Sequence, residues 1–296
     1  MSTSFPDFYL QQKSRVEEAL DRWLPDEEEF PSLLNRSMRY SIFNGGKRLR
    51  GVLVLESGRL GEHCGEALEA LSAVLEMIHA YSLVHDDLPA MDDDDFRRGQ
   101  PSNHKKFGED IAILAGDGLL THVFGVVGEL DHLGVRSDIV AVVLRLLDRY
   151  AGGKGMIGGQ VLDLKASPTD GLEELQEIHR RKTAALITAA LEIGARISEI
   201  RDSERESLRT FGQSLGLLFQ IKDDLLEVDG TLESLGKDPD SDEEKEKLTY
   251  PSLLGVEESK TALKETRERA LNALSSISAE TDRLQEILDL VIERKH

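Results

Sequence analysis

Hydrophobic residues recur every three or four positions along most of the chain, which is the spacing of a helix with one apolar face. Within residues 66–84, six apolar positions follow this spacing: Leu68, Leu71, Val74, Leu75, Ile78 and Leu83. The same pattern predicts further helices over about residues 109–131, 136–150, 172–198, 202–228, 257–275 and 280–293. The alternating pattern typical of strands is nearly absent. We therefore predict an all-α bundle that forms one domain over residues 1–296.

The breaks between these helices carry turn residues. Most of the eight prolines stand where predicted helices end, because proline cannot continue a helical hydrogen-bond ladder. Residues 230–247 combine two Gly, one Pro and alternating charge, so we expect a mobile surface loop there.

The composition limits the classes of function. Hydrophobic residues make up 40% of the chain, which is enough for a packed core. The formal net charge of −20 disfavours nucleic acid and anionic membranes as general partners. A single cysteine, Cys64, excludes an intrachain disulfide and a multi-cysteine metal site. No basic N-terminal stretch leads into an apolar one, and no run approaches about 18 apolar residues, so we expect no membrane span and a cytoplasmic protein.

Two acidic clusters, at residues 85–95 and 220–227, lie inside apolar helical patterns. In the second cluster, Asp223 and Glu227 are one helical turn apart and share a face. Carboxylate oxygens suit Mg²⁺, which shares its remaining positions with phosphate oxygens. For either cluster alone, a solvated acidic face is the simpler explanation, but the pair of clusters favours a metal site.

The first cluster needs a break in its helix before its carboxylates can converge. Asp86 and Asp92 would point about 240° apart on an ideal helix. Pro89 interrupts the regular ladder between them, so the chain can fold back and bring Asp92 toward Asp86.

Basic residues accompany the acidic clusters. Lys47 and Arg50 are three positions apart, Arg97 and Arg98 directly follow the first cluster, and His79 lies two helical turns before Asp86. Arginine binds phosphate oxygens through a planar fork, and lysine supplies a point charge. Together these residues indicate a site for a diphosphate and metal ions. Taken singly, the Gly-Gly-Lys-Arg segment would be a turn before a helix and His79 a core histidine.

Several motifs occur in a fixed order. They are Gly45–Arg50 (GGKRLR), Asp86-Asp87 followed after four residues by Asp92, Arg97–Gly99 (RRG), Gly159–Leu164 (GQVLDL), Lys182-Thr183, Phe219–Asp224 (FQIKDD) and Lys247–Gly255 (KLTYPSLLG). Over nearly the whole chain, this order resembles the bacterial short-chain trans-isoprenyl diphosphate synthases, and most closely the farnesyl diphosphate synthases, or geranyltranstransferases.

The resemblance implies an isoprenoid-synthase helical bundle around a central cavity and a prenyltransferase activity. The expected reaction is the head-to-tail (1′–4) condensation of dimethylallyl or geranyl diphosphate with isopentenyl diphosphate, giving (2E,6E)-farnesyl diphosphate. Asp86, Asp92 and Asp223 would bind about three Mg²⁺ ions, which assist ionisation of the allylic diphosphate.

The resemblance also assigns roles to other residues. It implies that isopentenyl diphosphate is bound by Lys47, Arg50, His79 and Arg98. The allylic diphosphate would be held by Arg97, Lys182, Lys237 and Lys247. The catalytic set that stabilises the developing allylic cation would be Lys182, Thr183 and Gln220. Support for the acidic motifs would come from Asp87, Asp224 and Glu227.

Product length would be set below the first acidic motif, by Tyr81 and Ser82. An aromatic residue at position 81 resembles the enzymes that stop at the fifteen-carbon product. Position 81 lies about 7.5 Å down the helix from Asp86 and some 140° around it, whereas Ser82 lies about 40° around it. Ordinary interhelical packing is an equally good explanation of Tyr81.

Three departures from the family pattern and three alternatives accompany this interpretation. Glu227 replaces the usual Asp, the segment between Lys237 and Lys247 is unusually acidic, and Leu248 replaces a small polar residue. The alternatives are a geranylgeranyl diphosphate synthase, an inactive relative that serves as a regulatory or structural subunit, and a terpene cyclase. The four isopentenyl diphosphate ligands argue against the terpene cyclase. The resemblance implies a homodimer, and the apolar stretches 111–120 and 123–127 suit either a core or an interface.

Overall fold

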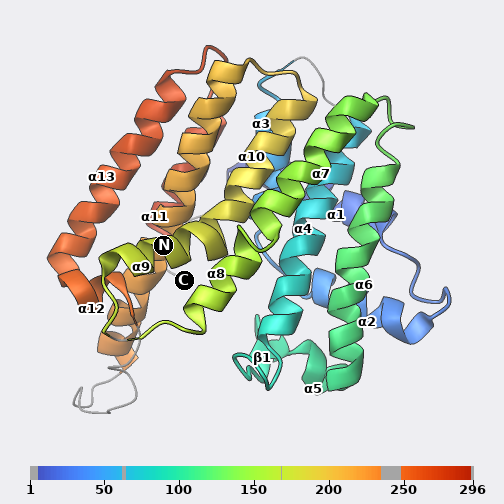
Figure 1. Ribbon diagram of the computed structural model, residues 1–296, viewed down its shortest axis with the longest axis horizontal. Helices are drawn as coiled ribbons and strands as arrows, with labels where there is room; N and C mark the ends of the chain where they lie inside the picture. Colours follow the sequence, from blue (N-terminus) through green and yellow to red (C-terminus); the bar gives the residue numbers. More distant parts are fainter. Residues whose placement is uncertain (1–5, 62–64, 168, 235–247, 295–296) are drawn as a thin grey trace. The chain divides into compact units, whose positions relative to one another are not determined.

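The computed structural model describes residues 6–61, 65–167, 169–234 and 248–294. They divide into two compact units, one of residues 6–144 and 196–199 and the other of residues 145–195 and 200–294. Helices make up most of both units, as Figure 1 shows, so the predicted all-α class is confirmed. The single domain over 1–296 and the central cavity stay predictions.

The N-terminal unit, residues 6–144 and 196–199, is built around one helix. Its elements are α1 (Asp7–Trp23), α2 (Ser32–Phe43), α3 (Leu49–Gly58), α4 (Glu66–Asp86), β1 (Phe96–Arg97), β2 (Gln100–Pro101), α5 (Asn103–Phe107), α6 (Glu109–Gly128) and the first part of α7 (Ser137–Ala151). Helix α4 packs against α1, α2, α3 and α6, and Figure 1 shows α4 and α6 side by side. Because α4 has neighbours on several sides, apolar residues line most of its circumference and not one stripe.

Two helices of this unit, α4 and α6, are long and apolar enough to cross a membrane by length and composition. In α4, 78% of the apolar window is buried inside the protein, so its composition is that of a core helix. In α6 only 39% of the window is buried, which leaves an apolar face on the surface of this unit.

The C-terminal unit, residues 145–195 and 200–294, contains the second acidic cluster. Its elements are the last part of α7, α8 (Met156–Asp163), α9 (Leu172–His179), the π-helix η1 (Arg180–Ala184), α10 (Ala185–Ile197), α11 (Asp202–Ser234), α12 (Tyr250–Leu254), α13 (Val256–Ser275) and α14 (Asp282–Glu293). Helix α11 packs against η1, α12, α13 and α14, and Figure 1 shows α13 running beside it.

The structure corrects the sequence pattern in four places. Helices α1, α2, α3, α5, α8 and α12 lie outside the predicted helical ranges. The segment 172–198 is not one α-helix, because a π-helical turn interrupts it at Arg180–Ala184. Helix α11 continues to Ser234, one turn past the expected start of the loop at Gly230, and the remaining residues of that loop lie outside those described.

The fourth correction is a small antiparallel hairpin. Strands β1 and β2 pair Phe96 with Pro101 and Arg97 with Gln100. Arg98 and Gly99 form its turn, and both have positive φ (55° and 75°), as in the turns that fit the twist of a hairpin. Strands of two residues are too short to produce an alternating pattern, so periodicity could not reveal them.

A histidine is buried beside α12. The ring of His179 stacks on that of Tyr250, with centroids 5.8 Å apart and planes at 21°. Tyr250 belongs to an apolar cluster with Leu175, Ile221 and Leu225. Burial, assisted by the nearby charge of Lys182, lowers the pKa of His179 to about 4.

This lowered pKa predicts a pH dependence of stability. The unfolded chain binds a proton on His179 near the ordinary pKa of about 6.5, and the folded chain does not, so stability falls as the pH drops below that value. Between about pH 7.5 and 5.5, both above the isoelectric point of about 4.8, we expect this histidine to remove about 1 kcal/mol from the free energy of unfolding. Urea denaturation at both pH values measures the change.

The control is the exposed His132, whose pKa is raised by its hydrogen bond to Glu129. H179Q should reduce the loss of stability between the two pH values, and H132Q should not reduce it. An unchanged pH dependence in H179Q would contradict the assignment.

Candidate active site

The first acidic motif lies where α4 ends. His79, Tyr81, Ser82 and Asp86 all belong to the last two turns of this helix, and Asp87 is its C-cap. Beyond it the chain turns back, because the amide of Asp92 donates to the carbonyl oxygen of Asp86 at 2.8 Å. The fold-back expected from Pro89 is therefore confirmed for the backbone, and the convergence of the two carboxylates stays a prediction.

Arg97 joins this motif through the hairpin. Its Nε donates to Asp87 Oδ1 at 2.9 Å, and its Nη2 donates to the same oxygen and to Asp94 Oδ2, the latter at 2.9 Å. Burial raises the pKa of Asp87, and the hydrogen bond and charge of Arg97 partly oppose that rise. Asp87 thus holds Arg97 beside the motif.

Arg98 turns toward the Gly45–Arg50 segment. Its guanidinium donates to the carbonyl oxygen of Gly45, and a Cβ at Gly46 would lie 2.7 Å from its Nη1. Gly46 also has a φ of +127°, which favours glycine. These glycines let the loop approach the arginine closely, which brings two of the predicted basic motifs together.

Arg50 and His79 lie in the same positively charged environment. Burial lowers the pKa of Arg50 to about 10. Burial, followed by the charges of Arg50 and Arg98, holds the pKa of His79 well below 6.5. The imidazole is therefore neutral at physiological pH, and an arriving anion would favour its protonation.

Two buried residues that the sequence reasoning missed support this group. Arg48, only 4% exposed, donates to the carbonyl oxygen of Ile42 at 2.6 Å, and its Nη1 lies 3.9 Å from Glu76 Oε2. Glu76 accepts the backbone amide of Gly51 at 2.9 Å, which ties the start of α3 to α4. The sequence does indicate that Glu76 is unusual, because this charged residue interrupts an apolar stretch of α4.

The backbone of Lys47 is held by α1. Tyr9 Oη donates to the Lys47 carbonyl oxygen at 2.9 Å, and the Tyr9 ring is buried.

The N-terminal unit also has a depression beside the side chains of Arg97 and Arg98. It is lined by Tyr40, Ser41, Asn44, Ala80, Leu83, Val84, Asp87, Arg97, Arg98, Ser102 and Asn103.

Tyr81 and Ser82 have different environments. Tyr81 is 5% exposed, its hydroxyl has no hydrogen-bond partner, and its ring meets the His85 ring edge-on at 5.9 Å. Burial and the charge of Asp86 raise the pKa of Tyr81 to about 12. Ser82 Oγ donates to the carbonyl oxygen of His79 at 2.9 Å. His85 lies one turn further along α4, so this ring contact is within one helix, and both explanations of Tyr81 stay open.

In the C-terminal unit, the π-helix η1 carries Lys182 and Thr183. Lys182 Nζ donates to Asp163 Oδ2 at 2.5 Å, and Thr183 Oγ1 donates to Gln220 Oε1. The structure thus joins three of the ordered motifs. π-Helical turns occur frequently at functional sites.

Two glycines allow this close packing. A Cβ at Gly159 of α8 would lie 2.2 Å from the backbone nitrogen of Lys182. A Cβ at Gly216 of α11 would lie 2.3 Å from Cα of Ala184. Backbones cannot yield as a flexible side chain can, so both positions require glycine in this arrangement.

The second acidic motif occupies one turn of α11. Asp223 Oδ1 lies 2.8 Å from Nη2 of Arg294, whose guanidinium stacks over the Phe219 ring at 3.7 Å. Asp224 Oδ2 accepts the backbone amide of Tyr250 at 2.9 Å and so fixes the start of α12. Glu227 is exposed. The predicted ligands Lys237 and Lys247 lie outside the described residues.

Comparison with known proteins identifies the family. The model of the polyprenyl synthetase family matches residues 31–291. The chain is 42% identical over 303 residues to a farnesyl diphosphate synthase of Bacillus subtilis (strain 168), covering all of both chains. It is 44% identical over 265 residues to geranylgeranyl pyrophosphate synthase 7, chloroplastic, of Arabidopsis thaliana, covering 86% of this chain and 74% of that one.

The fold comparison agrees. A solved geranyltransferase from Legionella pneumophila superposes with a TM-score of 0.86 at 31% identity, covering 97% of this chain and 96% of that one. The resemblance inferred from the ordered motifs is therefore confirmed: the chain belongs to the polyprenyl synthetase family and is a prenyltransferase.

Proposed function

We propose that the protein is a farnesyl diphosphate synthase that condenses an allylic diphosphate with isopentenyl diphosphate. The observation that carries this proposal is the group at the end of α4, where a backbone hydrogen bond joins Asp92 to Asp86 and a cationic group lies around Arg98. Identity of 42% with a farnesyl diphosphate synthase over the whole chain supports the same activity.

The acidic motifs fit Mg²⁺. Their donors are carboxylate oxygens, the hard ligands this ion prefers, and the backbone hydrogen bond between Asp92 and Asp86 holds these two residues on one short turn. We propose Asp86, Asp92 and Asp223 as ligands and about three ions per site, as the resemblance implies. Bound Mg²⁺ would neutralise the departing diphosphate and so make the allylic carbon–oxygen bond easier to break.

The protein's own residues complete the site. Lys47, Arg50, His79 and Arg98 would bind isopentenyl diphosphate. This is consistent with the lowered pKa of His79, to which the charges of Arg50 and Arg98 contribute after burial. Arg97 and Lys182 would hold the allylic diphosphate, with Lys237 and Lys247.

Two further side chains would act on the reacting carbon atoms. The hydrogen bond from Thr183 to Gln220 fixes the orientation of both polar groups. The Thr183 oxygen and the Gln220 carbonyl would then stabilise the developing cation, together with helix carbonyls near Lys182. Bond formation to isopentenyl diphosphate and loss of one proton then give the longer allylic diphosphate, with inorganic diphosphate released as the other product.

The metal proposal predicts a specific loss of activity. D92N removes one charged oxygen ligand, so we expect kcat to fall at least about 100-fold and the Mg²⁺ concentration for half-maximal rate to rise. The matched control is D138N, an exposed residue paired with exposed Arg136. Steady-state rates over a Mg²⁺ series measure both effects, and a D92N enzyme with normal metal dependence would refute the assignment.

Product length is the second open choice, because relatives include both farnesyl and geranylgeranyl synthases. We propose that Tyr81 closes the space for the growing chain. Y81A should therefore shift the product from fifteen to twenty carbons, as measured by chromatography after dephosphorylation. Y150A, another buried tyrosine, is the control. A Y81A enzyme that still stops at fifteen carbons would leave Tyr81 as a packing residue.

We also propose that the protein is cytoplasmic and a homodimer. The apolar face of α6 supports the dimer, since Ile113, Leu114 and Phe124 are 45%, 52% and 61% exposed. Large exposed apolar side chains that gather in a patch mark protein interaction sites, so we assign these three to the interface.

The dimer has a direct test. F124E should weaken association at least about tenfold, because a buried phenylalanine contributes about 2 kcal/mol. F30E, at a residue 93% exposed in a turn before α2, is the matched control. Light scattering during size-exclusion chromatography gives the mass of each variant. A wild-type monomer would refute the proposal.

A further inference from the structure

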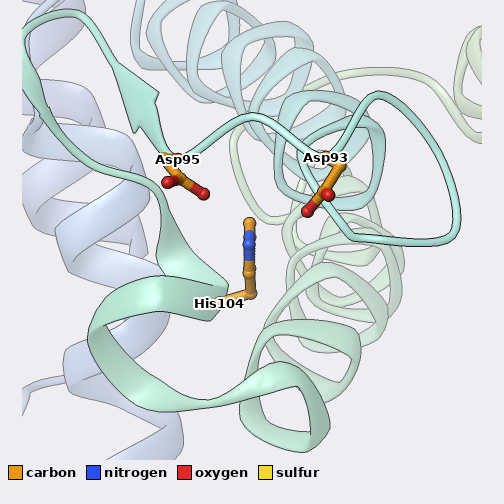
Figure 2. A group of neighbouring side chains, drawn as sticks. All are labelled: Asp93, Asp95 and His104. Carbon is orange, nitrogen blue, oxygen red and sulfur yellow. The ribbon is translucent and has the colours of Figure 1, made fainter.

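A second group of metal-binding side chains lies beside the first acidic motif. It contains Asp93, Asp95 and His104, which offer one ligand atom each, all within 4.8 Å of one another. Figure 2 shows the His104 ring, which rises from α5, pointing between the two carboxylates. Neither aspartate belongs to the set proposed above for Mg²⁺.

The histidine provides an independent sign of a ligand. His104 is only 5% exposed. Its Nδ1 lies 3.1 Å from Ser102 Oγ, whereas its buried Nε2 has no hydrogen-bond partner. A buried nitrogen without a partner is costly. Histidines that bind metals commonly use one nitrogen for the ion while a hydrogen bond holds the other, which is the arrangement here.

The carboxylates can reach an ion at this nitrogen. Both aspartates are exposed, so their side chains can rotate and close the 4.8 Å spread to the roughly 3.3 Å that tetrahedral coordination needs. Lys105 Nζ lies 2.7 Å from Asp95 Oδ1. A carboxylate has two oxygens, so this ion pair leaves the other oxygen for coordination.

We propose that Asp93, Asp95 and His104 bind a divalent transition-metal ion of the Zn²⁺ class. One imidazole nitrogen and two carboxylate oxygens favour Zn²⁺ over Mg²⁺, which prefers oxygen ligands alone. Water would fill the remaining coordination position.

Such an ion would brace the segment that carries the proposed active-site residues. Asp93 directly follows Asp92, and Asp95 precedes Arg97 by two positions. On the other side, Asn103 is fixed to α2, because its Nδ2 donates to Ser37 O at 3.0 Å and to Ser41 Oγ at 2.6 Å. The metal would therefore tie the turn after α4 to a rigid part of the unit.

The test is Zn²⁺ binding by the full-length protein. Chelator-treated protein is dialysed against Zn²⁺ with millimolar Mg²⁺ present to fill magnesium sites. We expect one tightly bound Zn²⁺ per chain, with an imidazole ligand detected by X-ray absorption. H104Q and D95N should each weaken binding at least about tenfold, and H132Q, at an exposed histidine, should leave it unchanged.

Two further variants keep the outcome unambiguous. D95N changes an exposed residue, so it tests the site even if H104Q fails to fold. D86N separates this site from the proposed Mg²⁺ site: the proposal requires D86N to retain Zn²⁺. Absence of Zn²⁺ binding, or loss in D86N with retention in H104Q and D95N, would overturn it. Neither result bears on prenyl transfer, which the Mg²⁺-dependent rates test separately.

Discussion

One backbone hydrogen bond, from the amide of Asp92 to the carbonyl oxygen of Asp86, organises the end of α4. It reverses the chain within six residues, so two aspartates whose side chains an uninterrupted helix would point apart belong to one turn. The hairpin that follows then returns Arg97 to Asp87, the capping residue of the same helix. The first acidic motif and the basic residue Arg97, which follows it in the sequence, are in this way brought together at the end of α4.

The net charge of the whole chain differs in sign from the charge around His79. The formal charge of −20 describes the whole chain, yet at His79 burial, assisted by the positive charges of Arg50 and Arg98, holds the imidazole neutral. The buried carboxylate of Glu76 offsets part of this charge and attaches α3 to α4. Whole-chain charge therefore argues against polyanionic partners and says little about a small diphosphate.

The sequence predicted the long helices and the grouping of basic residues beside the first acidic cluster. Helical periodicity and the order of the motifs can be read from the chain without tertiary contacts. It missed the features that only packing creates. The π-turn at Lys182 depends on the close approach of Gly159 and Gly216, and the two-residue strands are too short to have a period. Arg48 likewise resembles a solvated charge in sequence, and its structural role follows from its burial and its backbone partner. For Asp224 the sequence indicated the acidic motif, but not its hydrogen bond to the backbone of Tyr250.

The π-turn has a consequence for how this part of the chain can vary. A π-turn contains one residue more than an α-helical turn, and each residue of an α-helix advances the side-chain direction by about 100°. Removing one residue between Arg180 and Ala184 would restore a regular helix, but it would rotate the preceding helix α9 relative to α10. The number of residues in this turn therefore fixes the rotation of the preceding helix relative to α10. We expect substitutions in these five residues to be tolerated more readily than insertions or deletions.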